Sequence, residues 1–228
     1  MLDIKVMASG SRGNCYLVGD GKSRLLLDAG ISYPKIQEGC QWQAADVDGC
    51  LITHCHKDHS LSVNELSRRG VKVYGPPDLQ RQGLLAIPIK PMQKVPLGTF
   101  DATPFKAVHD VECYGYHIRS LVTGETLIYL TDSAEVCYTF KNIDYWLIEA
   151  NHSVEILDRK VAEGLDPTRA NRTIATHMGL EKLEKYFSGL DCSMAREIYL
   201  IHLSDDNSDE EEFKRRIQRV TGAAVTVA

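Results

Sequence analysis

The first third of the chain alternates short apolar runs with turns, a pattern that predicts β-strands. Gly19-Asp20-Gly21-Lys22 separates two of these runs and is typical of a hairpin. Val63 and Leu66, followed by Gly70, predict a helix over residues 62–69 that ends at the glycine. The predicted strands of this part cover residues 4–8, 15–18, 24–27, 50–53 and 71–74.

Strand patterns continue from residue 99 to residue 130, with Thr123-Gly124 as a turn, and helices become more frequent afterwards. Strands are predicted at residues 145–148 and 198–203, and helices at residues 154–163, 180–187 and 208–220. The chain has no internal repeat and no linker rich in Ser, Gly or Pro. We therefore expect residues 1–228 to form one domain of mixed α and β structure.

Composition adds limits to this interpretation. The 228 residues are 43% hydrophobic and 25% charged, which excludes a collagen, a disulfide mini-protein and a wholly disordered chain. The seven cysteines form no C-x-x-C pair, which argues against a zinc knuckle or a thioredoxin motif. The first residues do not resemble a signal peptide, and no apolar run approaches the about 20 residues that span a bilayer. We expect a cytoplasmic protein without a membrane segment.

The charge balance is acidic, with 26 Lys and Arg against 31 Asp and Glu and a net charge of −5. Nucleic-acid-binding proteins often carry a basic stripe, and the bulk charge provides none here. Bound metal cations would offset part of the deficit, so the sign of the charge excludes no class of partner.

The segment T-H-C-H-K-D-H at residues 53–59 is the most informative part of the sequence. Side chains two residues apart in an extended segment point the same way, so His54 and His56 can face one point. A following turn would bring Asp58 and His59 toward a second point. Imidazole and carboxylate groups are ligands for zinc, manganese or iron. A solvated polar loop is the alternative, and three histidines beside an aspartate in one short segment argue against it.

The pattern H-x-H-x-D-H after a strand resembles the metallo-β-lactamase fold. Four further motifs of that family have counterparts in the same order along the chain, at Asp28, His109, Asp132 and His202. The resemblance implies an α/β protein with an αββα sandwich, in which two mixed β-sheets carry helices on their outer faces. It also implies a single domain over residues 1–228 without an inserted second domain.

Other motifs are similar to the YycJ/WalJ-type nuclease branch of this family. They are A-S-G-S-R-G-N-C at residues 8–15, Gly115-Tyr116, E-A-N-H at residues 149–152 and H-L-S-D-D-N at residues 202–207. Two positions depart from the branch, because Cys55 stands where Glu is usual and A-T-H-M at residues 175–178 replaces Gly-His-Leu-Ser. The resemblance implies a DNA exonuclease.

The resemblance also implies a ligand set for two divalent metal ions per chain, Zn²⁺ or Mn²⁺. The first ion is assigned to His54, His56 and His109, the second to Asp58, His59 and His202, and Asp132 bridges both. A hydroxide between the two ions would attack the phosphodiester. Asp28 is expected to orient a ligand histidine rather than to bind metal.

Residues with catalytic or substrate roles are less clearly marked. His177 is the candidate proton donor, or a holder of the scissile phosphate, because it precedes a predicted helix start. Asp58 is an alternative general base. Ser9, Ser11, Arg12 and Asn14 form a small polar loop that either approaches a phosphate or is a tight turn. His152 either contacts substrate or lies at the surface, and we expect Cys55 to be small and buried.

Three functions remain in competition at this stage. A DNA exonuclease is the leading hypothesis, with Arg12, Arg169 and Arg172 as scattered cations along a DNA channel. A phosphodiesterase of small nucleotides, such as cyclic nucleotides, suits a compact acidic chain and requires a narrow pocket. A metal-binding partner protein without catalysis would require a blocked pocket. Homodimers are frequent among relatives, and this analogy makes a homodimer an expectation.

Overall fold

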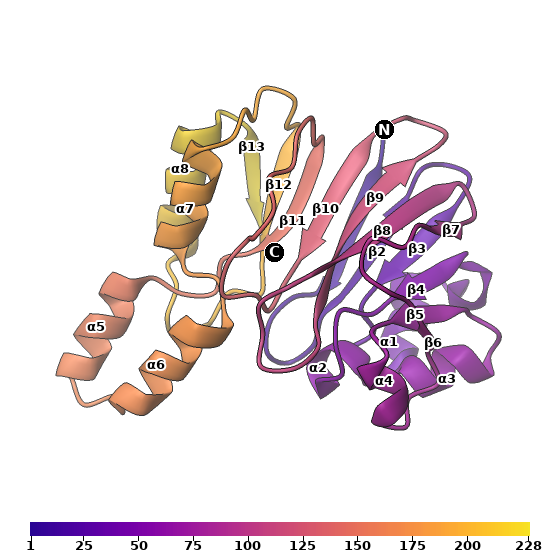
Figure 1. Cartoon of the computed structure of the whole chain (residues 1–228), viewed down its shortest axis with the longest axis horizontal. Coiled ribbons are helices and arrows are strands. Elements are labelled where there is room, and N and C mark those ends of the chain that lie inside the picture. The colour runs from indigo at the N-terminus through magenta and orange to yellow at the C-terminus, as the bar shows by residue number, and fades with distance from the viewer. The chain divides into compact units, whose positions relative to one another are not determined.

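The computed structural model describes residues 1–228, which divide into two compact units (Figure 1). Unit 1 contains Met1–Lys106 and Val111–Thr126, and unit 2 contains Ala107–Asp110 and Leu127–Ala228. The single domain expected from the sequence stays a prediction. No helix of the structure has the length and apolar character needed to cross a membrane.

The first sheet of unit 1 has six strands, which lie in the order of the sequence. The first three strands pair antiparallel and the last three continue parallel from β3, so the sheet is mixed. The strands are β1 (Asp3–Ala8), β2 (Cys15–Gly19), β3 (Arg24–Leu27), β4 (Gly49–Leu51), β5 (Val73–Gly75) and β6 (Ile87–Pro88).

Helices cover one face of this sheet because alternate strand residues are apolar on that side. Leu26, Cys50 and Val73 join one buried cluster with Ile36 of α1 and Leu66 of α3. The helices of unit 1 are α1 (Tyr33–Gly39), η1 (Ala44–Asp46), α2 (Lys57–Ser60), α3 (Val63–Arg68) and α4 (Asp78–Arg81).

Three antiparallel strands complete unit 1, namely β7 (Val95–Leu97), β8 (Phe100–Lys106) and β9 (Tyr114–Ser120). They are attached to the end of β4 by two hydrogen bonds. The hydroxyl of Tyr116 donates to the carbonyl of Ile52 at 2.5 Å, and the amide of Tyr114 donates to the carbonyl of Thr53 at 2.9 Å. The strand β9 therefore fixes the backbone immediately before His54.

Asp20 ties the β2–β3 hairpin to β8 and β9. Its buried carboxylate accepts hydrogen bonds from the amides of Lys22 and Ser23 and from the hydroxyls of Thr99 and Ser120, at 2.7–3.0 Å. Burial alone would raise the pKa of Asp20, but these four donors hold it at about 2.

We expect Asp20→Ala to lower the free energy of unfolding by about 2–4 kcal/mol at pH 7, because charge-assisted hydrogen bonds are lost. A lowered pKa stabilises the folded state above the unfolded pKa near 4, and this contribution is lost as the pH falls toward 2. Urea titrations between pH 2 and pH 7 would measure both effects. Asp3→Ala, at an exposed aspartate, is the control, and equal curves for the two variants would contradict the prediction.

Unit 2 is built on four parallel strands in the order β13-β12-β11-β10. The strands are β10 (Thr126–Leu130), β11 (Tyr145–Glu149), β12 (Glu197–Ile201) and β13 (Ala224–Val227). Helices α7 (Leu180–Ser188) and α8 (Glu210–Thr221) pack together, and α8 contacts β13. Trp146 of β11 meets the ring of Phe187 edge-on at 5.2 Å, which places α7 against the sheet.

Helices α5 (Val154–Ala162) and α6 (Pro167–Thr176) form a separate hairpin in unit 2 (Figure 1). Each buries a single residue, Leu157 in α5 and Ala170 in α6. The sequence did not predict α6, because its residues show no apolar stripe. The helix begins where Pro167 follows Asp166, whose side chain accepts a hydrogen bond from the amide of Thr168.

The α/β class with two mixed sheets and helices is confirmed, and most predicted elements are present within two residues of their expected bounds. The exceptions are short or polar elements. Helix α1 has seven residues, of which two are buried. The edge strands β6 and β13 bury at most one residue and β7 has three residues, so they lack the apolar run that marks a buried strand.

Candidate metal centre

In unit 1, the predicted ligands lie where two parallel strands end. Strands β3 and β4 are neighbours in the sheet, and the carboxyl ends of parallel neighbours meet at the same edge. Asp28 follows β3 directly, and His54 comes three residues after the end of β4. The chain then turns into the single helical turn α2, which carries Asp58 and His59.

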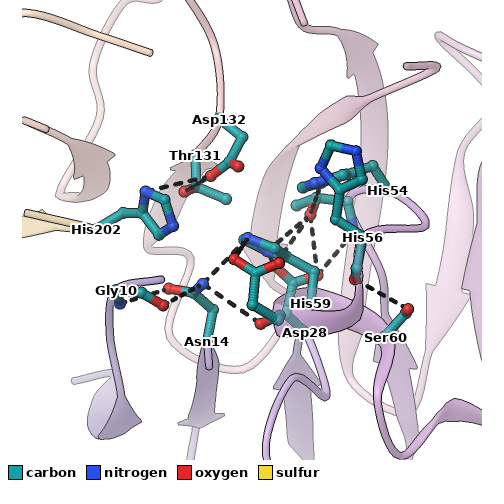
Figure 2. A network of polar contacts seen from close by, with 12 residues as sticks. Gly10, Asn14, Asp28, His54, His56, His59, Ser60, Thr131, Asp132 and His202 are labelled. Atoms are coloured by element: carbon teal, nitrogen blue, oxygen red, sulfur yellow. Dashed lines mark hydrogen bonds and ion pairs between the residues drawn. The ribbon is translucent and has the colours of Figure 1, made fainter. Parts of the chain in front are cut away.

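The segment from His54 to His59 gathers its imidazoles as the sequence predicts. The ring centroid of His54 lies 4.6 Å from that of His56 and 4.3 Å from that of His59. The Oδ2 atom of Asp58 lies 3.4 Å from Nε2 of His59. The hydroxyl of Ser60 donates to the carbonyls of Cys55 and His56 and fixes the turn (Figure 2). Cys55 is half-buried against the apolar cluster of unit 1.

Asp28 is fully buried behind this segment. Its Oδ2 atom lies 2.6 Å from Nδ1 of His59, and its Oδ1 atom accepts hydrogen bonds from the amide and hydroxyl of Thr53 (Figure 2). A carboxylate at Nδ1 keeps the proton on that nitrogen, so the lone pair of His59 is on Nε2. Asp28 therefore fixes the tautomer that a metal ligand needs.

In unit 2, the carboxyl ends of β10, β11 and β12 form a second edge of the same kind. Asp132 follows β10, Glu149 is the last residue of β11, and His202 follows β12. Ligand atoms of Asp132, Glu149, His177 and His202 all lie within 4.8 Å of one another. The hydroxyl of Thr131 donates to Oδ1 of Asp132 at 2.8 Å (Figure 2).

Glu149 is the site residue that sequence reasoning did not assign. Its Oε1 atom lies 2.7 Å from Nδ1 of His177 and 2.9 Å from Nδ1 of His202, and its Oε2 atom accepts from the amides of Ser133 and Met178. Burial alone would raise the pKa of Glu149, but the two histidines hold it well below its usual range. The available signal was a single charged residue at the end of the otherwise apolar, fully buried strand β11.

His177 lies at the end of α6, three residues before the first residue of α7. Its ring stacks on that of His202 at 5.4 Å and meets that of His109 edge-on at 5.9 Å. Burial would lower the pKa of His177, but the carboxylate of Glu149 raises it above its ordinary value. With 22% of its side chain exposed, His177 combines a retained proton with access to solvent.

His109 is held by the same helix end. Its Nδ1 atom donates to the carbonyl of Thr176 at 3.1 Å, and its Nε2 atom lies 3.8 Å from Oδ2 of Asp132. Burial lowers the pKa of His109, so the ring is neutral near pH 7. His59, His109 and His202 therefore all engage an acceptor through Nδ1, which leaves the Nε2 lone pair as the coordinating position.

Three strand-end residues share an unusual backbone conformation. Asp28, Asp132 and His202 have φ values of 56°, 50° and 55°, in the left-handed region that non-glycine residues seldom occupy. Each follows its strand at the carboxyl edge and turns its side chain out of the strand path. Such strain is common at functional sites, where the surrounding structure holds it in place.

The residues expected to contact substrate fall into two groups. Ser11 and Arg12 are exposed and Ser9 is half-buried, whereas Asn14 and His152 are buried, with 0% and 1% exposure. The surface position, one of the two alternatives that the sequence allowed for His152, is therefore excluded. Its backbone bridges to Gly179, and burial lowers its pKa to about 4. Neither Asn14 nor His152 presents a surface to a substrate in this structure.

The donor chemistry of both units fits a divalent metal ion. Neutral imidazole nitrogens and carboxylate oxygens are the ligands of zinc and manganese sites, and the buried carboxylates Asp28 and Glu149 support the histidines from behind. The chain offers no cysteine among these donors. A hard or borderline ion is therefore favoured over a thiolate-bound one.

Comparisons with known proteins show which proteins this chain is similar to. The Metallo-beta-lactamase superfamily profile matches residues 8–88. Exodeoxyribonuclease WalJ of Streptococcus pneumoniae is 28% identical over 90% of this chain and 83% of its own length. Exodeoxyribonuclease YycJ of Bacillus anthracis is 28% identical over 96% of this chain and 89% of its own length. The crystal structure of the metallo-beta-lactamase fold protein YhfI from Bacillus subtilis superposes with a TM-score of 0.77, at 22% identity, over 100% of this chain and 96% of that protein. The structural likeness shows that this chain has the metallo-β-lactamase fold, and its sequence is similar to those of two exodeoxyribonucleases.

Proposed function

We propose that this protein is a metal-dependent phosphodiester hydrolase that degrades DNA from an end. The observation that carries the proposal is the set of imidazole and carboxylate donors at the carboxyl ends of β4, β10 and β12. Two relatives that align over most of the chain bear the name exodeoxyribonuclease, which supports DNA as the substrate.

We propose that the protein binds two divalent ions, Zn²⁺ or Mn²⁺, through the seven ligands that the family resemblance implies. When bound, such ions lower the pKa of water and neutralise charge on a phosphodiester. The ligands are His54, His56, Asp58 and His59 from unit 1, and His109, Asp132 and His202 from unit 2.

His177 is proposed to donate the proton to the leaving oxygen. The hydrogen bond from Nδ1 to Glu149 keeps its ring oriented and protonated, so Nε2–H is the donor that remains for the substrate. Glu149 thereby accepts hydrogen bonds from two histidines. It orients His202 for metal binding and raises the pKa of His177.

The loop at residues 9–13 is proposed to bind a substrate phosphate. Ser11 and Arg12 are exposed at its tip, and an arginine can present two parallel N–H groups to a phosphate. We also propose that the two units form one domain, and that the protein acts as a homodimer in the cytoplasm. These last expectations rest on the likeness to the family.

The test is hydrolysis of end-labelled linear DNA by protein loaded with Mn²⁺, with a chelator control and a mixture of cyclic nucleotides run in parallel. Stepwise shortening of the DNA that stops with the chelator is expected, because bound metal ions would lower the pKa of the attacking water. Circular DNA without ends is the matched control and should stay intact. Intact linear DNA with cleaved cyclic nucleotides would replace the proposal by a small-nucleotide phosphodiesterase. Metal binding without any turnover would indicate a partner protein without catalysis.

A further inference from the structure

The side chain of Asn14 lies between the polar loop at residues 9–13 and the metal-binding segment of unit 1. It is fully buried, and its Nδ2 atom lies 3.0 Å from the carbonyl of Gly10, 3.0 Å from Nε2 of His59 and 3.4 Å from the carbonyl of Asp58 (Figure 2). Asn14 is therefore in contact with a proposed ligand and with the loop that precedes it.

The direction of these hydrogen bonds is fixed by their neighbours. The Oδ1 atom of Asn14 accepts from the amide of Gly10 at 3.0 Å, a group that can only donate, so the Nδ2 atom faces His59. The Nδ1 atom of His59 donates to Asp28, so Nε2 carries the lone pair and accepts from Asn14. The nitrogen that would bind a metal ion is thus engaged by the amide of Asn14.

An amide nitrogen has two hydrogens, and the Nδ2 atom of Asn14 has three acceptors around it. A metal ion on Nε2 of His59 removes one of these acceptors. Both hydrogens then remain for the carbonyls of Gly10 and Asp58. The backbone of Asn14 stays in place meanwhile, because its amide donates to the carbonyl of Asp58 at 2.8 Å and its carbonyl accepts from Gly30 at 2.9 Å.

We propose that metal binding frees the side-chain amide of Asn14 from His59 and leaves its two hydrogens to the carbonyls of Gly10 and Asp58. The stronger bond to Gly10 couples metal binding to the order of the loop at residues 9–13. This inference rests on the proposed metal site. Gly10 and Gly13 have φ values of 123° and 146°, and a Cβ on Gly13 would lie 2.7 Å from the carbonyl of Gly30. The loop therefore packs closely on the backbone of Gly30, and the bond from Asn14 to Gly10 strengthens when the amide leaves His59. Coupling is reciprocal, so an anion held by Ser11 and Arg12 would in turn favour the metal-bound state.

The experiment compares the wild-type protein with Asn14→Ala in two measurements that do not use activity. Titration with Co²⁺, followed by its visible absorption, gives the metal affinity. Cleavage by trypsin after the exposed Arg12, followed by release of the fragment of residues 1–12, gives the order of the loop. We expect metal to slow this cleavage severalfold in the wild type and not in Asn14→Ala. We expect Asn14→Ala to bind Co²⁺ about threefold to tenfold more tightly, because one competing hydrogen bond is gone.

Tyr16→Phe is the matched control. The hydroxyl of Tyr16 donates to Oδ1 of Asn14 and to Ser9, so its loss loosens the loop without touching His59. Cleavage should then be faster in both states, with the metal protection retained. A wild type that binds no Co²⁺ would overturn the metal site itself. A wild type that binds Co²⁺, with equal affinity and equal protection in Asn14→Ala, would overturn the role of Asn14 alone.

Discussion

Asp132→Asn is expected to reduce metal-dependent hydrolysis to the background rate while the protein stays folded. Asp132 is 3% exposed, accepts a hydrogen bond from Thr131, and lies 3.4 Å from Nδ1 of His202 and 3.8 Å from Nε2 of His109. It is the carboxylate between two proposed ligand histidines. An amide in its place lacks the negative charge that would hold two cations close together.

The choice of Asn rather than Ala follows from the backbone. Asp132 has a φ of 50°, a conformation that Asn tolerates and Ala does not. Thermal unfolding should therefore be almost unchanged, and elemental analysis should find fewer metal ions per chain. Exposed Asp205, which lies outside the proposed ligand set, provides the matched control as Asp205→Asn. Full metal content together with full turnover in Asp132→Asn would show that the bridging role belongs to another residue.

His177→Ala is expected to slow hydrolysis by about 10²–10⁴-fold, the range for loss of a general acid, while the metal content stays the same. His177 is the half-buried histidine whose pKa is raised by Glu149, and it lies outside the proposed ligand set. Its Nδ1 atom is committed to Glu149, so the ring acts through Nε2. Steady-state kinetics beside metal analysis would separate chemistry from metal binding.

A control variant and a control substrate test whether the loss of rate in His177→Ala comes from loss of a proton donor. His117→Ala removes a half-buried histidine on β9 that is outside the proposed ligand set, and should leave turnover unchanged. A substrate whose leaving group needs no proton, such as a nitrophenyl phosphodiester, should be cleaved by His177→Ala at nearly the wild-type rate. Loss of metal from His177→Ala would instead make His177 a ligand.

The sequence was sufficient for the strand-end residues of the site, and the reason is geometric. Asp28, His54, Asp132 and His202 each follow an apolar run that is long enough to be recognised as a buried strand. Parallel neighbours then end at the same edge, so residues distant in the sequence are brought together within each unit. The spacing within the segment at residues 53–59, and the position of the other residues after a strand, were the features that predicted the candidate ligands.

What escaped prediction depends on contacts that have no local pattern. Glu149 looked like part of a family motif, and its role depends on two histidines 28 and 53 residues away. The polar loop of Asn14 predicts either a phosphate contact or a tight turn, and no local pattern indicates that its buried amide contacts His59. The helix α6 is mostly polar and buries only Ala170, so its existence depends on a cap and on the contacts of its C-terminal end.

The proposed proton donor and the metal ligands on the sheet of unit 2 lie on elements of different local stability, because the donor is attached to the α5–α6 hairpin. Asp132 and His202 follow the strands of a buried sheet, whereas His177 is attached to a hairpin with one buried residue in each helix. Elements with so few buried contacts open locally at a lower free energy than the sheet they adjoin. Warming or a low concentration of denaturant would therefore displace the proton donor first, while the protein is still folded and keeps Asp132 and His202 in place. Heat inactivation of this enzyme would begin as a reversible loss of rate, well below its melting temperature.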